Sequence, residues 1–321
     1  MRVTLFLALA ACDRQGAGPR AQPKRVPVAC TTQPQSTLVH VALARGFFAA
    51  EGLDVAPVIL SHGRAALQEV LEGRCRFATV AETPVMFSAL RGEDTRVIAQ
   101  IEASTMNNAV VARRSAGIAG AGDLKGKRVA FTAGTTSEFF LDTLLTVLGL
   151  TRQDVVPVPC RPEDMVAALA ERKVDAVCTW NYPLTLARRA LGPDAVVIHD
   201  REVYTEFFTI ASLRSFLEQD PETARSFLRA LLRAEADVAR DPEGAQAIVA
   251  KATGTPPDLV REVWSAFRYR VVLEQGLLIA LEDETRWAMK NGLAPRGPMP
   301  DYRRVLQGDV LKAVAPPAAR I

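Results

Sequence analysis

Residues 128–150 read RVAFTAGTTSEFFLDTLLTVLGL and join a short apolar segment to an amphipathic one through a turn rich in hydroxyl groups. Val129–Phe131 is too short an apolar run for a helix and predicts a strand, and Gly134 allows the backbone to turn sharply after it. Phe140 and Leu144 begin a four-residue repeat that predicts a helix with one buried face. We therefore expect this turn to form the ligand-binding end of one lobe of a two-lobed protein.

The hydroxyl residues of this turn suit the start of a helix. Thr135 and Glu138 have the spacing of a capping box, and Thr136 and Ser137 fall in the first helical turn. Unpaired backbone N–H groups and the positive end of the helix dipole favour a bound phosphate, sulfonate or carboxylate. The Glu138 carboxylate works against an anion, and an ordinary strand-to-helix connection is the alternative interpretation.

The composition is that of a folded protein and gives no sign of nucleic-acid binding. The protein has 321 residues, of which 49% are hydrophobic, enough for two compact lobes with buried cores. Its net charge of +3 comes from basic residues scattered among nearly as many acidic ones, so the sequence has no nucleic-acid-binding run.

The N-terminus carries a candidate export signal. The apolar run Val3–Ala11 follows Arg2 and ends in Leu-Ala-Ala-Cys at Cys12, which resembles the lipobox of bacterial lipoproteins. The run is too short to span a bilayer, which predicts a processed signal at 1–12 and lipidation of Cys12. The Gly, Pro, Gln and Arg-rich segment 13–25 predicts a flexible tether. A start site further upstream would account for the short signal, and a buried N-terminal strand is the alternative.

The remaining cysteines show no metal-binding spacing. Three of them end strand-like apolar runs, which is typical of small core residues, and the sequence does not decide whether any pair forms a disulfide. The four residues are Cys30, Cys75, Cys160 and Cys178.

Strands alternate with helices in two series, which predicts two α/β lobes built on parallel sheets. A polar break at 102–108 and a glycine-rich connection at 117–127 separate the series. We assign 26–112 and 206–321 to lobe one and 113–205 to lobe two. From residue 215 the pattern is helical, with a helix from Pro257 through Phe267 and another over 275–290, and these C-terminal helices are expected to pack on lobe one. The predicted strands are 26–30, 55–60, 77–80, 95–101, 109–112, 129–131, 155–159, 174–179, 195–199 and 207–212.

Four segments together resemble the solute-binding proteins of ABC importers, in the branch for nitrate, sulfonates, taurine and thiamine-precursor pyrimidines. The resemblance implies a two-lobed periplasmic-binding-protein fold of type II, a hinge between the lobes, and a ligand held where the strands end. It also implies a permease and its ATPase as partners, a monomeric protein outside the cytoplasm, and no cofactor. The segments are ARGFFAAEGLDV (44–55), DLKGKRVA (123–130), GTTS (134–137) and KVDAV (173–177) before Trp180.

The candidate ligand-binding residues follow the ends of the predicted strands. Trp180 is placed to stack on a planar ligand, with a role in capping the core as the alternative. His62 lies in a Ser-His-Gly turn and is either a ligand contact or only a turn residue. Glu82 would favour a ligand with N–H donors or a cation, and solvent exposure is its alternative. The full set is Gln33, Ser36, Thr37, His62, Gly63, Glu82, Thr83, Asn108, Thr135, Thr136, Ser137, Trp180 and Asn181, with Tyr182 as a further candidate.

The rival hypothesis is an enzyme on the same fold, acting on a pyrimidine or a quinone-pathway precursor. A cleft with Glu82 and His62 would suit acid–base chemistry. The chain has no Cys or His cluster with metal-ligand spacing, and the lipobox argues against a cytoplasmic pathway, so we expect no metal and no enzyme activity.

Overall fold

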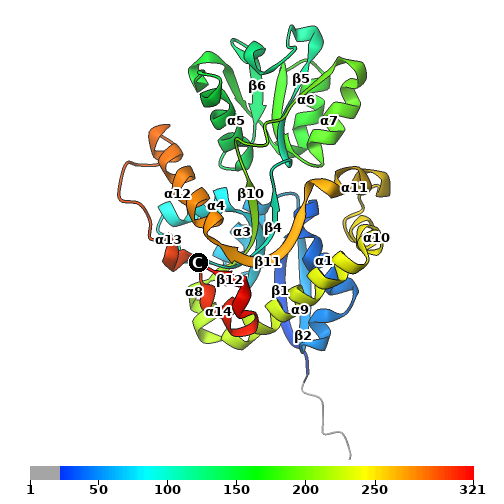
Figure 1. Cartoon of the computed structure of the whole chain (residues 1–321), viewed down its shortest axis with the longest axis vertical. Coiled ribbons are helices and arrows are strands. Elements are labelled where there is room, and N and C mark those ends of the chain that lie inside the picture. Colours follow the sequence, from blue (N-terminus) through cyan, green and yellow to red (C-terminus); the bar gives the residue numbers. More distant parts are fainter. Residues whose placement is uncertain (1–21) are drawn as a thin grey trace, which may run out of the picture.

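The computed structural model describes residues 22–321 and forms two lobes, each built around its own β-sheet (Figure 1). The first sheet has seven strands in the order β12-β11-β4-β10-β3-β1-β2, and the second has five in the order β7-β6-β8-β5-β9. The predicted two-lobed α/β architecture is therefore confirmed. The predicted signal at 1–12, Cys12 and residues 13–21 of the tether lie outside the described residues.

Lobe one begins with parallel strands joined by helices, as the sequence predicts. β1 (Lys24–Thr31) pairs in parallel with β2 (Leu53–Leu60) and with β3 (Phe77–Ala81). β1 starts at Lys24, inside the predicted tether, because Lys24 and Arg25 continue the register with Leu53 and Asp54. The helices between these strands are α1 (Thr37–Ala44), α2 (Phe47–Ala50) and α3 (Gly63–Leu71), and α4 (Glu82–Leu90) follows β3.

Two antiparallel strands complete this sheet and depart from the parallel arrangement that the sequence predicts. β10 (Glu206–Leu213) returns from lobe two and inserts between β3 and β4 (Thr95–Ser104), antiparallel to both. β11 (Arg268–Glu274) pairs antiparallel with β4, and the two-residue β12 (Ala319–Arg320) lies at its edge. The sequence pattern does not indicate β11, and the predicted helix before it runs too far, to Phe267. That helix ends at Val263, and a short 3-10 turn leads into the strand.

Lobe two contains a mixed sheet and three helices. β6 (Arg128–Phe131) is parallel to β7 (Val156–Pro159) and β8 (Ala176–Trp180). β5 (Asn108–Arg113) runs antiparallel to β8 and β9 (Ala195–Ile198), so residues 108–112 belong to this sheet and not to lobe one, where we had assigned them. The helices are α5 (Thr136–Val147), α6 (Met165–Ala170) and α7 (Pro183–Leu191).

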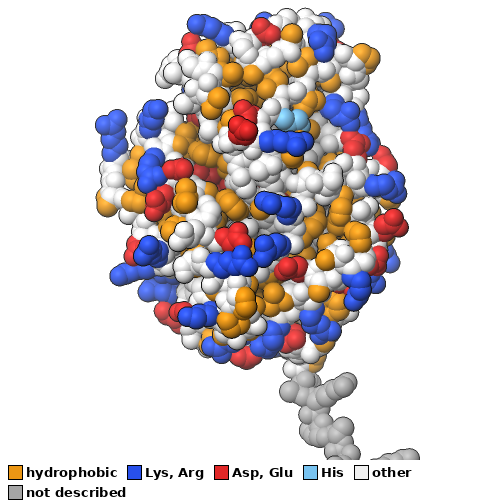
Figure 2. All heavy atoms as spheres, viewed as in Figure 1, with side chains coloured by type: hydrophobic (Ala, Val, Ile, Leu, Met, Phe, Trp, Pro, Cys, Tyr) orange, Lys and Arg blue, Asp and Glu red, His pale blue; other side chains and the backbone are white. Residues whose placement is uncertain are grey.

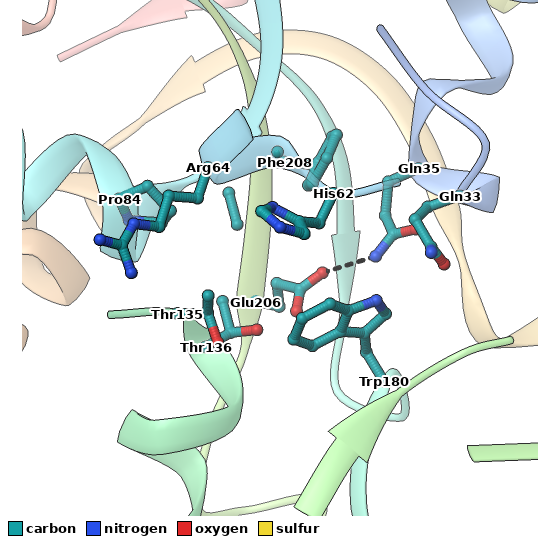
Figure 3. A pocket seen from close by; sticks show the side chains of 12 residues that line it. Gln33, Gln35, His62, Arg64, Pro84, Thr135, Thr136, Trp180, Glu206 and Phe208 are labelled. Carbon is teal, nitrogen blue, oxygen red and sulfur yellow. Dashed lines mark hydrogen bonds between the residues drawn. The ribbon is translucent and has the colours of Figure 1, made fainter. Parts of the chain in front are cut away.

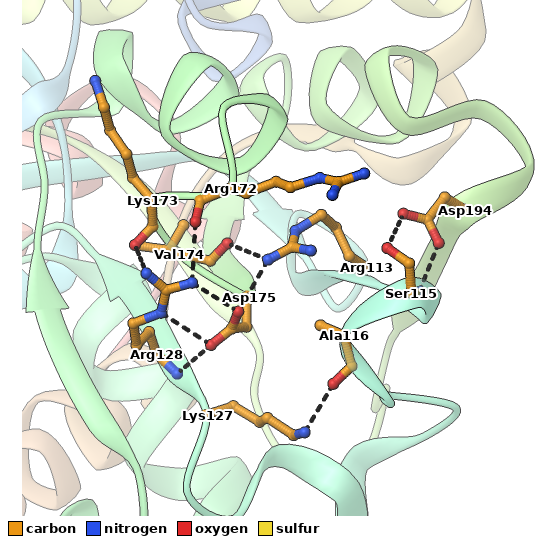
Figure 4. Close-up of polar contacts among 10 residues, drawn as sticks. All are labelled: Arg113, Ser115, Ala116, Lys127, Arg128, Arg172, Lys173, Val174, Asp175 and Asp194. Atoms are coloured by element: carbon orange, nitrogen blue, oxygen red, sulfur yellow. Dashed lines mark hydrogen bonds and ion pairs between the residues drawn. The ribbon is translucent and has the colours of Figure 1, made fainter.

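One carboxylate ties together three strands of lobe two (Figure 4). Asp175 Oδ1 accepts hydrogen bonds from the guanidinium groups of Arg113 (2.9 Å) and Arg128 (3.0 Å). Its Oδ2 accepts from the backbone N–H and Nε of Arg128 (2.9 and 3.1 Å), and these bonds lower the pKa of Asp175. The segments 123–130 and 173–177, which carry part of the family resemblance, therefore meet in a structural contact at the start of β6.

The C-terminal helices pack on lobe one, as expected. Phe227 of α9 stacks on Phe77 of β3 and on Phe48 of α2, with ring centroids 4.3 and 4.8 Å apart. These contacts place α9 directly over the first sheet. The helices are α8 (Arg214–Gln219), α9 (Pro221–Arg240), α10 (Pro242–Thr253), α11 (Pro257–Val263), α12 (Gln275–Lys290), α13 (Tyr302–Val305) and α14 (Gly308–Val314). The 3-10 turns are 34–36, 114–116, 121–124, 152–154, 162–164, 192–194, 264–266 and 316–318.

The chain crosses between the lobes from β4 to β5 and from β9 to β10, and side chains hold the lobes together on both sides of these crossings (Figure 1). On one side, Arg188 and Arg189 of α7 form ion pairs with Glu262 of α11. On the other, Trp287 Nε1 of α12 donates to Asp142 Oδ2 of α5 (2.8 Å). Side chains of the two lobes are thus in contact on both sides of the crossings.

The surface and the cysteines add two further findings. On the face in Figure 2, Lys and Arg side chains are interspersed with acidic ones over most of the surface. None of the helices within 22–321 combines the length and the apolar character needed to cross a membrane. All four cysteines of this part of the chain are free thiols, and Cys30, Cys75 and Cys178 are buried.

Candidate functional site

A pocket lies between the two lobes, where strands of both sheets end (Figure 3). Its cavity volume is about 30 Å³, enough for one or two water molecules. A larger ligand therefore needs the lobes to move apart. Lobe one contributes the residues before α1, the start of α3, the start of α4 and β10, while lobe two contributes the start of α5 and the end of β8. The lining residues are Gln33, Gln35, His62, Gly63, Arg64, Ala81, Pro84, Thr135, Thr136, Trp180, Glu206 and Phe208.

The start of α5 faces this pocket. Gly134 has a φ of +69°, a left-handed conformation that glycine adopts without strain. Thr135 caps the helix with its backbone while its hydroxyl donates to Thr132 O (2.7 Å). No described residue accepts from the backbone N–H groups of Thr136 and Ser137. The turn therefore offers the pocket unpaired donors at the positive end of a helix.

The predicted capping box of Thr135 and Glu138 is wrong. Glu138 Oε2 accepts from the backbone N–H of Gly134 (2.7 Å), one residue before the cap, because Gly134 turns that group toward the helix. Glu138 Oε1 accepts from Arg152 Nη1 (2.8 Å). Because Arg152 neutralises this carboxylate, Glu138 does not repel an anion as strongly as the sequence analysis assumed.

The turn before α3 supplies a neutral donor and a cation. His62 Nδ1 accepts from the backbone N–H of Ala65 (3.2 Å) and caps the helix. Burial lowers the pKa of His62, so the ring is neutral near pH 7 and carries its proton on Nε2. Arg64 Nη1 donates to Ala133 O of lobe two (2.8 Å), and Arg64 forms no ion pair with the part of the chain that the structure describes. Its guanidinium lies beside Pro84, on the side of the pocket away from Trp180 (Figure 3).

Gly63 lies too close to β3 for a side chain. A Cβ atom at residue 63 would come within 2.8 Å of Val80 Cα and 3.3 Å of Thr79 O, and both are backbone atoms. We expect Gly63→Ala to lower the free energy of unfolding by about 1–3 kcal/mol, as overpacking does. Chemical denaturation measures this loss. Gly122→Ala is the control, because no atom lies within 4 Å of its added Cβ. Equal stability of the two variants would contradict the close packing of α3 on β3.

Glu206 is the carboxylate of the pocket. It is only 1% exposed, and three side-chain amides donate to it. Gln35 Nε2 (3.0 Å) and Asn107 Nδ2 (2.7 Å) bind Oε1, and Asn108 Nδ2 (2.6 Å) binds Oε2. Burial raises the pKa of Glu206, while the amide bonds oppose that rise. The amides come from the loop before α1 and from the β4–β5 crossing, so Glu206 joins lobe one to the hinge.

Trp180 ends β8 and forms one wall of the pocket. Its side chain is 6% exposed, yet it belongs to none of the apolar clusters formed by residues 22–321. Its side chain is therefore almost fully covered by protein atoms beside the pocket. Next to it, Gln33 Oε1 accepts from the backbone N–H of Tyr182 (3.2 Å), which fixes Gln33 between the lobes.

Six of the thirteen candidate ligand contacts line the pocket: Gln33, His62, Gly63, Thr135, Thr136 and Trp180. The other seven do not. Ser36 and Thr37 bond within lobe one, Ser137 Oγ donates to Cys178 O (2.8 Å), and Asn181 Oδ1 accepts from Thr185 (2.9 Å). Asn108 does not line the pocket but lies behind two residues that do: it donates to Glu206 and accepts from Thr136 Oγ1 (3.2 Å). Tyr182 packs in an apolar cluster with α10 and α11.

The candidate role of Glu82 is the main correction, together with that of Thr83. Glu82 is fully buried, neither lining the pocket nor facing solvent, and accepts from Tyr204 Oη and from the backbone N–H of Phe207 (3.0 Å). Thr83 Oγ1 donates to Glu284 of α12 (2.5 Å). Because α4 begins at Glu82 itself, both residues belong to the first turn of the helix, and their side chains bond to Tyr204, Phe207 and Glu284 instead of facing the pocket. Glu206 takes the position that the sequence analysis gave to Glu82.

Sequence reasoning missed six of the lining residues: Gln35, Arg64, Ala81, Pro84, Glu206 and Phe208. Gln35 and Arg64 lie within two residues of predicted contacts, so extending each loop by one turn would have found them. Glu206 and Phe208 lie on the return strand β10, whose insertion beside β3 no local pattern indicates.

Glu102 of β4 is buried beneath this region, and neither of its carboxylate oxygens has a hydrogen-bond partner among residues 22–321. Burial raises the pKa of Glu102 well above its ordinary value of 4.5. The folded protein therefore holds this proton at pH values where the unfolded chain has lost it. Stability from this group is complete below pH 4.5 and declines as the pH rises toward the folded pKa.

We expect Glu102→Gln to remove this decline. Its melting temperature should equal that of the wild type near pH 5 and exceed it at pH 8, by about 2–4 °C for each kcal/mol gained. Thermal unfolding across pH 5–8 measures the difference, with the exposed Glu202→Gln as control. A constant offset between variant and wild type at all pH values would contradict the buried, protonated state of Glu102.

The site contains no metal-binding arrangement. Within residues 22–321, no group of three or more His, Cys, Asp or Glu side chains is placed to hold a metal ion.

The chain is similar to a family of known proteins. The family model described as "NMT1/THI5 like" matches residues 33–245. A protein of Bacillus subtilis named for the binding of aliphatic sulfonates is 26% identical over 72% of this chain and 71% of its own length. The riboflavin-binding protein RibY of Chloroflexus aurantiacus is 27% identical over 74% of this chain and 69% of its own length. Both relatives are named as binding proteins and not as enzymes.

A solved structure shares the fold. The periplasmic aliphatic sulphonate binding protein SsuA from Escherichia coli superposes with a TM-score of 0.76. The two chains are 19% identical, and the match covers 88% of this chain and 92% of SsuA. The predicted periplasmic-binding-protein fold is confirmed.

Proposed function

Because the chain belongs to the NMT1/THI5-like family, we propose that it captures a small organic molecule between its lobes and delivers it to an ABC importer. The observation that carries the proposal is the pocket itself. It lies between two lobes, is lined by residues of both, and contains donors, one carboxylate and an aromatic wall. Such a site needs no catalytic step, since binding and lobe closure are sufficient.

Two ligand classes fit the lining groups. A sulfonate or taurine-like head matches the unpaired N–H groups of α5 and the cation of Arg64. An aminopyrimidine-like ring, as in thiamine precursors, matches the flat face of Trp180 and the acceptor Glu206. The cavity of about 30 Å³ is smaller than either class, so binding requires the lobes to separate and close again around the ligand.

The partners follow from the role. A membrane permease and its ATPase receive the ligand, and the permease releases it by favouring the open lobes. We propose that a monomer acts in the periplasm or on the exterior of the cell envelope. Lipidation at Cys12 after removal of the signal 1–12 would anchor it to the membrane.

A thermal-shift panel tests the function. The panel contains aminopyrimidines, alkyl and aryl sulfonates, taurine, nitrate and amino acids. A ligand at one hundred times its Kd stabilises a protein by about 2.7 kcal/mol, so a true ligand raises the melting temperature in a saturable way. Saturable stabilisation by one chemical class supports the proposal. Absence of a shift with every compound, combined with turnover of any of them, would contradict it.

A further inference from the structure

We propose that Glu206 makes the pocket selective for ligands that carry a hydrogen-bond-donating nitrogen, an ammonium or an amino group, opposite an acceptor or anionic end. This inference rests on the proposed function and names the ligand class of the same pocket. It separates amine-bearing ligands from bare anions such as nitrate and from simple alkyl sulfonates.

The hydrogen bonds of Glu206 leave one position for a ligand. A carboxylate has about four lone-pair sites on its two oxygens. Gln35 and Asn107 fill two sites on Oε1, and Asn108 fills one on Oε2. Thr136 Oγ1 donates to Asn108 Oδ1 (3.2 Å) and also lies near enough to Glu206 to lower the pKa of that carboxyl. The fourth site is on Oε2 beside this hydroxyl, where a ligand N–H can take it while the Thr136 proton stays on Asn108.

The charge of Glu206 also lacks a partner. The three amides bound to it and the Thr136 hydroxyl beside it are all neutral, and no Lys or Arg of residues 22–321 forms an ion pair with it. A carboxylate buried to this degree is unfavourable without an opposite charge or a full set of donors. A ligand N–H group supplies the missing donor, and an ammonium group supplies the charge as well.

Gln35 presents a second acceptor on the same wall. Its Nε2 is committed to Glu206, and its buried Oε1 has no partner among the described residues. Gln35 lines the pocket beside Glu206 (Figure 3). Two acceptors with no remaining donor fit a nitrogen that carries at least two hydrogens.

Other groups that line the pocket are donors. They are Arg64, the Nε2–H of His62 and the first N–H groups of α5. Glu206 lies between the start of α5 and the aromatic face of Trp180 (Figure 3). The pocket therefore matches a molecule with a nitrogen donor at Glu206, an apolar or planar part against Trp180, and an acceptor at α5.

Matched pairs of probes test this inference on the wild-type protein. Taurine and ethanesulfonate differ only by an amino group. 4-Amino-5-hydroxymethyl-2-methylpyrimidine and the same ring without the amino group form the second pair. We expect the amine-bearing member of at least one pair to bind about 100-fold more tightly in isothermal titration calorimetry, because the analogue leaves Glu206 unpaired.

The variant Glu206→Gln assigns the preference to this residue. It should remove most of the 100-fold difference and leave the affinity for the analogue without the amine within threefold. Glu202→Gln, an exposed carboxylate four residues away, is the matched control and should bind as the wild type does. The wild-type comparison needs no variant, so a folding defect in Glu206→Gln does not obscure the result.

The outcomes separate the two proposals. If the analogue without the amine binds as tightly as its partner, the role of Glu206 is refuted while the binding function stands. An amine preference that survives in Glu206→Gln also refutes it. If neither member of either pair binds to the wild type, both this inference and the proposed ligand range are overturned.

Discussion

The variant Trp180→Ala is expected to lose about 30- to 1,000-fold in ligand affinity while the protein stays folded. Truncation of a central aromatic contact in a desolvated site typically costs 2–4 kcal/mol. Trp180 forms a wall of the pocket and takes no part in the apolar clusters of either lobe. Because the side chain is only 6% exposed, its loss also leaves a cavity beside the pocket, and some loss of stability is expected together with the loss of affinity.

Calorimetric titration with the panel compound that stabilises the wild type most measures this effect. Thermal unfolding of the ligand-free variant measures the accompanying loss of stability and shows that the protein is folded at the temperature of the titration. Trp180→Phe is the matched variant, because it keeps an aromatic face and should recover a large part of the affinity. An unchanged Kd for Trp180→Ala would exclude Trp180 from the site.

The second large effect is expected at Asp142 of α5. Its carboxylate is 6% exposed and accepts from Trp287 Nε1 of α12 (2.8 Å) and from Arg152 Nε (3.0 Å). Arg152 also binds Glu138, which holds the Gly134 N–H at the ligand turn. One hydrogen-bonded chain thus runs from α12 of lobe one to the start of α5. Asp142→Ala leaves Arg152 and Trp287 without this acceptor.

We expect Asp142→Ala to reduce the free energy of unfolding by about 3 kcal/mol, the lower end for breaking a buried pair, since Arg152 is partly exposed. Urea denaturation measures this loss. Asp283→Ala is the control: its ion pair with Arg286 is on the surface and should change stability by less than about 0.5 kcal/mol. Similar losses in the two variants would contradict a special role for the Asp142 contact.

Trp287→Phe separates the hydrogen bond from the packing. It removes the Nε1–H donor but keeps a ring against Phe139, whose centroid lies 5.2 Å from that of Trp287. A loss of about 1 kcal/mol is expected, as for a single hydrogen bond.

Most of the fold could be predicted because its signals are local. The strand, glycine turn and amphipathic helix at 128–150 form β6 and α5 as expected. The missed features depend on contacts between distant segments. β11 exists because β4 offers it an edge, and β5 joins the second sheet because β8 and β9 flank it. No periodicity within 268–274 or 108–113 carries that information.

The site was partly predictable for the same reason. Residues directly after parallel strands meet at one edge of a sheet, and this rule found His62, Thr135 and Trp180. It failed for Glu82, because α4 starts at once and turns that side chain under the helix. It failed for Glu206, because this residue opens an antiparallel strand that enters the sheet from the other lobe. A carboxylate does line the pocket, as predicted, but it is Glu206 and not Glu82.

Small-angle X-ray scattering with and without ligand tests the central claim most directly. The account predicts that the panel compound with the largest thermal shift reduces the radius of gyration, and that the decrease saturates at the concentration given by its Kd. Trp180→Ala should show no decrease at that concentration. A radius of gyration that stays constant while the compound binds stoichiometrically would contradict capture by closure of the two lobes.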